Sequence, residues 1–501
     1  MQNTANLNTS NFDNKSVSES IDGIDLLDQI IQESKVAKSQ DEHSRTKDII
    51  SELIKEVMDG TVVISDNLCA ALDARIVELD ELISNQLSLI MHAPEFQKLE
   101  SSWRGLDYLC KQSVTGPMLK IRIFNTNKNE LTRDFQGALE FDQSALFKKV
   151  YDEEFGVFGG APYAAIIGDF EFGRQGSDMY LLEQISHVAA AAHAPFISSA
   201  APELMGLESF TDLGKPRDLA KVFDTLDYVK WKSFRESEDS RYVGLTLPHF
   251  LGRLPYDPKE GTTVEGFNFY EDVDGTDHSK YLWVNASYAF AARLTNAFDL
   301  YGWCAAIRGV EGGGLVEDLP CHTFKTDDGD IALKCPTEIS ITNRREKELS
   351  DLGFIPLVHC KNTDYAAFFG AQSVQKAKNY DSNSANANAG LSTQLQYMMA
   401  VSRIAHYMQA IIRDKIGAFA TAGNVQDFLN RWISQYILLD DGAGQDAKAR
   451  YPLREASIEV VEVPGKPGVY KAVAFLRPHF QLDELSIALR LVAELPKPAG
   501  R

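Results

Sequence analysis

The sequence predicts a mixed α/β protein of several domains, with a helical segment before the α/β body and a β-hairpin plus helix after it. Strand-like and helix-like stretches alternate through the middle of the 501 residues, which is the order expected of β-α-β units in a parallel or mixed sheet. Apolar residues form 44% of the chain, enough for the cores of about two to four domains.

The first 45 residues are predicted to be a flexible tail that carries one short amphipathic helix. Residues 1–20 are rich in Asn, Ser and Thr, a composition typical of disorder. In the stretch IDGIDLLDQIIQESKV that follows, apolar residues recur at helical spacing, and Ile24, Leu27 and Ile31 lie on one face. This face either docks on the protein's own body or binds a partner as a helix in a groove.

Residues 46–115 are predicted to be largely helical. The clearest helix is PEFQKLESSWRGLDYLCK, in which Pro94 suits the first turn. Its apolar stripe consists of Phe96, Leu99, Trp103, Leu106 and Leu109. A stripe at this spacing normally faces the core of its own domain, so we expect these five side chains to be buried.

Residues 116–450 are predicted to form the α/β body. We expect strands at residues 120–125, 164–172, 195–200 and 242–248. The second and third of these flank a helical stretch, which predicts a right-handed crossover between parallel strands. Residues 281–303 are apolar nearly all round and predict a buried helix.

The second half of the body shows two further patterns. CHTFKTDDGDIALKC predicts two short strands joined by a DDGD turn. EISITNRREKELSDLGFIPLVHC predicts strand, helix and strand, with Asn343 capping the helix together with Glu346, and Gly353 ending it.

Residues 451–501 are predicted to form a hairpin and a final amphipathic helix. In SIEVVEVPGKPGVYKAVAFLRPHF, two apolar runs flank a PGKPG connector. Neither run alternates cleanly, so both faces of the hairpin need cover. Its outer edges would also be open to strands of other chains. The helix LDELSIALRLVAEL follows at residues 482–495.

The charge excludes one class of partner, and the cysteines indicate a compartment. The 50 basic and 71 acidic side chains give a net charge of −21, which argues against nonspecific nucleic-acid binding because that needs a basic surface. Six cysteines without a CxxC pair indicate reduced thiols. The N-terminus has no signal-peptide pattern, and the longest apolar stretch, residues 188–201, is too short to cross a bilayer. We therefore expect a cytoplasmic protein that does not insert into a membrane.

No motif predicts an enzyme. The EGGG stretch at residues 311–314 lacks the Lys and Ser/Thr of a phosphate loop, and GRQG at residues 173–176 opens a helix but does not complete G-x-G-x-x-G. Cys321-His322, Cys335 and His359-Cys360 have irregular spacing for zinc. We expect no catalytic residue, cofactor or metal; a nucleotide- or metal-dependent α/β enzyme is the alternative.

Long blocks of the chain resemble one family. These blocks, which span roughly residues 94–496, include EFQKLESSWRGLDYL, FKKVYDEEFGVFGGAPY, RESEDSRYVGLTLP, YLWVNASYAFA, IRGVEGGGLVEDLP, KCPTEISITNRREKELSDLGFIPL and PGKPGVYKAVAFLRPHFQL. Together they are similar to the large sheath subunit of the type VI secretion system, the TssC/VipB (EvpB) family. One departure is His249, where the family leads us to expect arginine.

The resemblance implies a structural part of a contractile machine. The large subunit would pair with the small sheath subunit (TssB/VipA) through residues 46–115, and the heterodimers would polymerise helically around the Hcp tube from a baseplate. Contraction would then propel the tube. The AAA+ ATPase ClpV would disassemble the contracted sheath, gripping the N-terminal helix through Ile24, Leu27 and Ile31. The sheath of another phage-like contractile injection system is the related alternative.

The same resemblance assigns roles to the C-terminal segment. The hairpin would exchange strands between subunits, and its contact residues would be Val460, Val461, Val463, Tyr470, Val473 and Phe475. The final helix would face the tube through Leu485, Leu489 and Arg490. From residue 454 to the end there are seven basic and six acidic residues, so this segment differs electrostatically from the acidic chain, as an attachment surface could.

Overall fold

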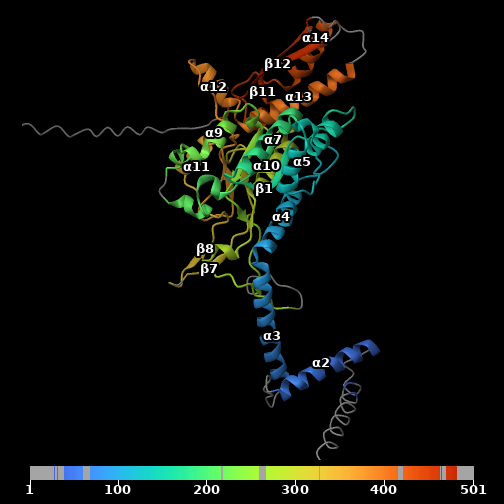
Figure 1. Ribbon diagram of the computed structural model, residues 1–501, viewed down its shortest axis with the longest axis vertical. Helices are drawn as coiled ribbons and strands as arrows, with labels where there is room; N and C mark the ends of the chain where they lie inside the picture. Colours follow the sequence, from blue (N-terminus) through green and yellow to red (C-terminus); the bar gives the residue numbers. More distant parts are fainter. Residues whose placement is uncertain are drawn as a thin grey trace, which may run out of the picture. The chain divides into compact units, whose positions relative to one another are not determined.

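The protein was analysed as a computed structural model (Figure 1), which describes Asp28, Ile31 and residues 39–59, 68–215, 218–258, 267–326, 328–415, 421–462, 464 and 470–481. The chain forms two compact units. The first comprises Met1–Ser88 with Tyr256–Glu271, and the second comprises Leu89–Pro255 with Asp272–Arg501. None of the described helices combines the length and apolar composition that a membrane crossing requires.

The first unit is built on two helices, α2 (Gln40–Met58) and α3 (Leu68–Met91). Helix α2 begins at a capping box, in which the Ser39 hydroxyl accepts from the Glu42 amide and the Glu42 carboxylate accepts from the Ser39 amide. Most of the described large apolar side chains of α3 are exposed, including Ile76, Val77 and Leu82. An apolar helix with this much exposed surface is typical of a segment that packs against another chain.

The second unit is built around a six-stranded sheet in the order β1-β2-β3-β9-β10-β6. Its strands are β1 (Ile166–Phe172), β2 (Phe196–Ala200), β3 (Val243–Leu247), β9 (Ile355–His359), β10 (Ala366–Phe368) and β6 (Leu315–Val316). The first four run parallel, and β10 and β6 each pair antiparallel. Helix α7 (Gly176–Ala192) connects β1 to its parallel neighbour β2, so the predicted β-α-β unit is confirmed.

Helices cover both faces of this sheet. On one side α7 contributes Leu181, Leu182 and Ile185 to a large core. On the other side α10 (Ala286–Tyr301) is buried along most of its length and packs against β1, β2 and β3. The prediction of a buried helix within residues 281–303 is confirmed. Parallel strands covered on both faces explain the continuous apolar runs seen in their sequences.

The remaining elements surround this centre. They are the helices α4 (Pro94–Lys111), α5 (Lys128–Gly137), α6 (Ala145–Phe147), α8 (Leu219–Phe223), α9 (Val229–Glu236), α11 (Asn343–Asp351), α12 (Asn383–Leu391), α13 (Leu395–Lys415), α14 (Ala422–Ile433) and α15 (Gln445–Arg450), a π-helix (Lys148–Phe155), and the strands β4 (Phe250–Leu251), β5 (Trp283–Val284), β7 (Thr323–Lys325), β8 (Ile331–Leu333), β11 (Leu453–Glu462) and β12 (Tyr470–Pro478). The predicted short strands on either side of DDGD are confirmed as β7 and β8.

Three local predictions were wrong. Residues 120–125 are not a strand, because no strand of the described chain pairs with them. The stretch EISIT at residues 338–342 before α11 is not a strand; the isolated bridge between Phe250 and Thr337 lies one residue before it. The N-cap of α11 is Thr342, without a side-chain cap, and not Asn343. Gly353 does follow the end of α11 with φ 88°, a conformation that glycine adopts without strain.

Helices α4 and α10 approach closely at Gly105. A Cβ placed on Gly105 would lie 2.4 Å from the Tyr288 ring of α10. We predict that Gly105→Ala destabilises the second unit by about 1–3 kcal/mol, because the ring must move out of a packed site. Gly137→Ala, at the end of α5 with nothing within 4 Å, is the matched control and should be neutral or slightly stabilising. Thermal unfolding of both variants measures this; equal midpoints would contradict the close packing.

Candidate assembly surfaces

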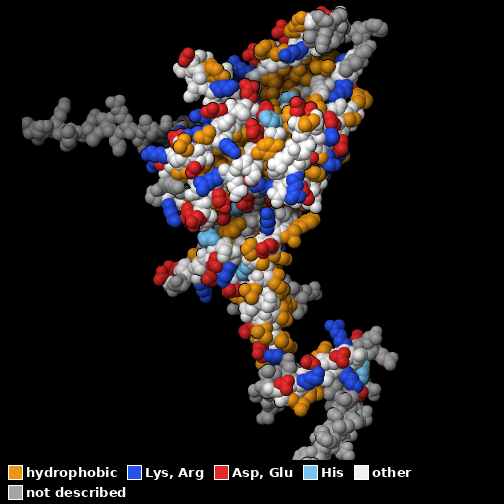
Figure 2. Space-filling view, viewed as in Figure 1, with side chains coloured by type: hydrophobic (Ala, Val, Ile, Leu, Met, Phe, Trp, Pro, Cys, Tyr) orange, Lys and Arg blue, Asp and Glu red, His pale blue; other side chains and the backbone are white. Residues whose placement is uncertain are grey.

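A large groove opens beside β1, the edge strand of the sheet. Its volume is about 2930 Å³, and it is lined by residues of α4, of the irregular segment after α4, of β1 and of α13. Figure 2 shows a hollow with hydrophobic side chains at the level of α13. Pockets for small molecules usually measure about 300–1,000 Å³. The size of this groove fits a segment of folded polypeptide.

The apolar stripe of α4 lies along this groove and is only partly covered. Leu109 is buried, but Leu99 is 57% exposed and Trp103 is 65% exposed, and both line the groove. The expectation that the whole stripe belongs to the protein's own core was therefore wrong for Leu99 and Trp103, and also for Phe96, which is exposed too. The described chain places no element over this part of α4.

The segment of residues 118–126 forms another wall of the groove. It has no regular secondary structure, and Met118, Ile123 and Phe124 are exposed. In the described structure its amides from residue 120 to 125 make no main-chain hydrogen bond. The segment is held through Arg122, which pairs with Glu154 and donates to the Tyr163 hydroxyl. The residues predicted as a strand thus pair with no strand of the described chain.

In the GRQG and EGGG turns, the protein's own groups occupy the positions where an anion would bind. The Asp178 carboxylate accepts from the Gly173 amide (2.8 Å) and pairs with the Lys128 ammonium (2.7 Å) at the start of α7. A Cβ on Gly314 would lie 2.5 Å from the Phe368 carbonyl, so the EGGG stretch packs tightly against β10. These contacts favour the interpretation of both stretches as structural turns.

Among the cysteines and histidines compared with a zinc site, one His-Cys pair is in contact. The Cys335 sulfur lies 3.3 Å from His359 Nδ1, and this hydrogen bond lowers the pKa of the Cys335 thiol although burial opposes it. Within the described residues, no group of three or more His, Cys, Asp and Glu side chains is placed to hold a metal ion.

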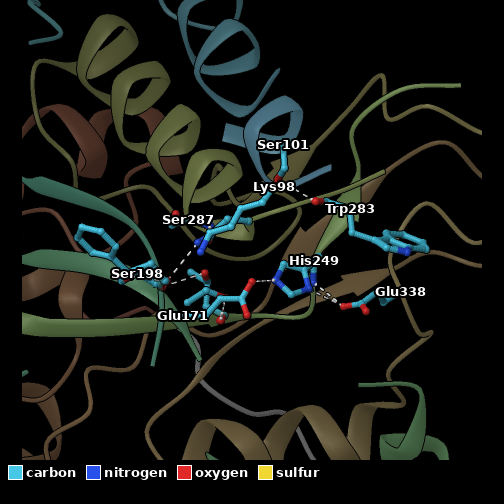
Figure 3. A network of polar contacts seen from close by, with 12 residues as sticks. Lys98, Ser101, Glu171, Ser198, His249, Trp283, Ser287 and Glu338 are labelled. Carbon is cyan, nitrogen blue, oxygen red and sulfur yellow. Dashed lines mark hydrogen bonds and ion pairs between the residues drawn. The ribbon is translucent and has the colours of Figure 1, made fainter. Parts of the chain in front are cut away.

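His249 lies between two carboxylates near the C-terminal ends of β1 and β3 (Figure 3). Its Nδ1 donates to Glu338 (2.7 Å), and its Nε2 donates to Glu171 (3.0 Å). Burial disfavours the imidazolium, but the two hydrogen bonds outweigh that cost and raise the pKa of His249 to about 10. His249 therefore carries a positive charge at neutral pH, as the expected arginine would.

The C-terminal hairpin packs one face on its own chain and leaves the other face open. Strands β11 and β12 pair antiparallel from Leu453 to Pro478, which confirms the predicted hairpin. On the inner face, Ile458 and Val460 are buried in a core with α13 and α14. On the outer face, Val461 is 48% exposed and Phe475 is 58% exposed. The protein's own helices thus cover one of the two hairpin faces that the sequence predicted to be covered.

Two amide side chains of α14 contact the edge of β11. Asn430 Nδ2 donates to the Ile458 carbonyl and Asn430 Oδ1 accepts from the Ile458 amide, both at 2.8 Å. Gln426 Oε1 accepts from the Val460 amide (3.0 Å). Neither residue was predicted from the sequence, in which the only signal is that two amides stand one turn apart on an amphipathic helix.

The structure places the predicted contact residues in different surroundings. Tyr470 and Val473 are exposed on β12, together with Phe475 on the outer face, whereas Val460 faces the core. Ile31 of the N-terminal helix is buried. The remaining predicted residues lie outside the described part of the chain: Ile24, Leu27, Val463, Leu485, Leu489 and Arg490.

Comparison with known proteins places the chain in a family. The family model "EvpB/VC_A0108, tail sheath N-terminal domain" matches residues 73–375, and the model for the gpW/gp25-like domain of the same tail sheath matches residues 384–495. The chain belongs to the EvpB/VC_A0108 tail-sheath family. It is 48% identical over 471 residues to the type VI secretion system sheath protein TssC1 of Pseudomonas aeruginosa, covering 93% of this chain and 94% of that protein.

Solved structures of contractile systems are more distantly similar. The anti-feeding prophage baseplate matches with a TM-score of 0.34 and 7% identity, over 63% of this chain and 66% of that one. The contracted sheath complex of an extracellular contractile injection system matches with a TM-score of 0.33 and 8% identity, over 62% and 68%. Because it belongs to this family and is similar to TssC1 over almost its whole length, the chain is a structural subunit that self-associates in a type VI contractile sheath.

The charged cluster predicts a pH-dependent contribution to stability. We expect His249→Gln to lower the free energy of unfolding by about 2 kcal/mol at pH 7, because it leaves two carboxylates without their cation. The His249 pKa is raised from its usual 6.5 to about 10. Its contribution is therefore full below pH 6.5 and is lost as the pH rises through 10.

Denaturant unfolding of the wild type and this variant from pH 6 to pH 10 measures the difference. His187→Gln is the control, because His187 pairs with only one carboxylate, that of Asp239, at a more exposed site. A stability difference that does not shrink as the pH rises would contradict the charge assigned to His249.

Proposed function

We propose that the chain is the large sheath subunit of a cytoplasmic type VI secretion machine and has no enzymatic activity. It pairs with the small sheath subunit (TssB/VipA), and the heterodimers polymerise around the Hcp tube from the baseplate and contract to propel the tube. Neither nucleic acid nor a membrane is a partner. The resemblance to this family and the surfaces described above support the proposal, and no contact in the described residues favours the nucleotide- or metal-dependent enzyme.

The observation that carries the proposal is the groove beside β1. Its walls expose apolar side chains at Leu99, Trp103, Met118 and Ile123, which a chain stable on its own would cover. The apolar helix α3 adds further exposed surface at residues 76–90. We assign the small sheath subunit to these surfaces, to which the helical segment of residues 46–115 contributes α3 and α4.

The other segments take separate roles in this assembly. Residues 1–45 carry the helix that ClpV grips through Ile24, Leu27 and Ile31, and residues 116–450 form the sheath body. Residues 451–501 contain the hairpin that exchanges strands with neighbouring subunits and the helix that faces the tube. Main-chain hydrogen bonds in a shared sheet would tie neighbours together while their bodies move during contraction.

Coexpression with the small sheath subunit tests the proposal. We expect hollow helical tubules by electron microscopy, and we expect Trp103→Asp to reduce copurification of the small subunit by about tenfold or more, because it places a charge in an apolar interface. Leu139→Asp is the control, since Leu139 is 91% exposed and does not line the groove. Both variants should keep the wild-type thermal midpoint. Only discrete particles from two folded wild-type subunits would argue against the sheath assignment.

A further inference from the structure

The ladder of the hairpin determines which main-chain groups point away from it. In an antiparallel pair, residues directly opposite each other alternate between exchanging both hydrogen bonds and exchanging none. Ile458 lies opposite Ala474, and both main-chain groups of Ile458 bond to Asn430. Ile458 and Ala474 therefore exchange no main-chain hydrogen bond with each other. By alternation, the groups of Ala456 and Val460 on β11 also point outward.

On β12, the residues opposite these are Ala472, Ala474 and Leu476. Their amides and carbonyls consequently point away from β11, toward the outer edge of β12. Among the described residues, none donates or accepts a hydrogen bond at these main-chain groups. The outer edge of β12 is thus an unpaired row of alternating donors and acceptors, which is the chemistry that another extended chain completes.

The outer edge of β11 is closed at its centre. The Asn430 amide bonds to both main-chain groups of Ile458, as a residue of a neighbouring strand would, and Gln426 takes the Val460 amide. Covering an edge with a helix is one of the ways by which proteins prevent unwanted strand addition. A strand that adds to β11 would have to displace these amide side chains, whereas the outer main-chain groups of β12 have no hydrogen-bond partner among the described residues.

Charge distinguishes the two strands as well. Strand β12 contains Lys471 and Arg477 and no acidic residue, whereas β11 contains Arg454 and three glutamates. The exposed Val473 and Phe475 stand on the outer face of β12. Arg477 already pairs with Glu455 of β11 (3.7 Å). A strand that lies beside β12 is therefore matched best if it carries acidic residues near Lys471 and apolar residues next to Val473 and Phe475.

We propose that the outer edge of β12, and not that of β11, receives an extended strand with acidic residues from another sheath subunit, and that Gln426 and Asn430 set this choice. This inference rests on the proposed strand exchange and adds the edge, the chemistry of the incoming strand and the residues that select it.

Proline substitutions on the two edges test the choice of edge. Proline removes an amide hydrogen and is tolerated in an edge strand where that amide points to solvent. Ala474→Pro blocks the β12 edge, and Ala456→Pro is its matched control on β11, beyond the contacts of Gln426 and Asn430. Each variant is coexpressed with the small sheath subunit, and heterodimer yield, thermal midpoint and tubules are measured. If Ala474→Pro fails to give heterodimer, Ala472→Pro on the same edge replaces it.

We expect both variants to form heterodimers, but only Ala456→Pro to form tubules of normal length. Normal tubules from the β12 variant, or their loss from Ala456→Pro alone, would overturn the choice of edge. A variant lacking residues 460–476 separates this outcome from failure of the proposed function. If that deletion still forms normal tubules, strand exchange itself is wrong.

A second variant tests the role of the two amides. Gln426→Leu combined with Asn430→Leu opens the β11 edge, so we expect heterodimers that associate irregularly in light scattering, and we expect Ala456→Pro to suppress this association. Heterodimers that stay monodisperse when both amides are removed would overturn the role assigned to Gln426 and Asn430.

Discussion

The rest of this structure depends on one constraint. Some main-chain amides and carbonyls have no hydrogen-bond partner within the described chain. The central sheet has helices on both faces, and β10 and β6 extend it on one side. At the groove beside β1 and at the outer edge of β12, however, backbone groups remain without a protein partner. In the free subunit water can satisfy them, so their cost is small. Replacing that water with a strand of another subunit contributes about 0.5–1.5 kcal/mol for each bond.

Among the described residues, one face and one edge of the hairpin are occupied, which would suit it to the proposed role of a joint between subunits. Its inner face is fixed to the body through the core that Ile458 and Val460 share with α13 and α14. Its β11 edge is held by the same helix through Asn430. In the proposed assembly, the remaining face and edge point to other subunits. On the proposed assembly, this division lets a hairpin move with its own body while it stays bonded to its neighbour.

The sequence was sufficient where burial occurs within one chain. The alternation of strands and helices predicted the β1-α7-β2 unit, and the PGKPG connector between two apolar runs predicted the hairpin. It was misleading at apolar residues that the described chain leaves exposed, and at residues 120–125, which no described strand pairs. Residues 120–125 and the stripe at Leu99 and Trp103 have the periodicity of a strand and of a core-facing helix, but periodicity does not say which chain supplies the cover.

Contacts between distant polar residues could not be predicted from the sequence. His249 meets Glu171 and Glu338 only because β1, β3 and the segment before α11 come together in space. Asn430 reaches Ile458 only because α14 packs over the edge of β11. Such pairs depend on tertiary placement rather than on local pattern, and a single sequence carries no sign of which polar residue will find which partner.

Amide hydrogen exchange in the free heterodimer and in the assembled sheath tests the central claim most directly. The amides of Ile458 and Val460 should be protected in both states, because Asn430 and Gln426 already hold them. The amides of Ala472, Ala474 and Leu476 should exchange rapidly in the heterodimer and become protected only in the sheath. If these three amides exchange equally fast in both states, the β12 edge is not the joint between subunits.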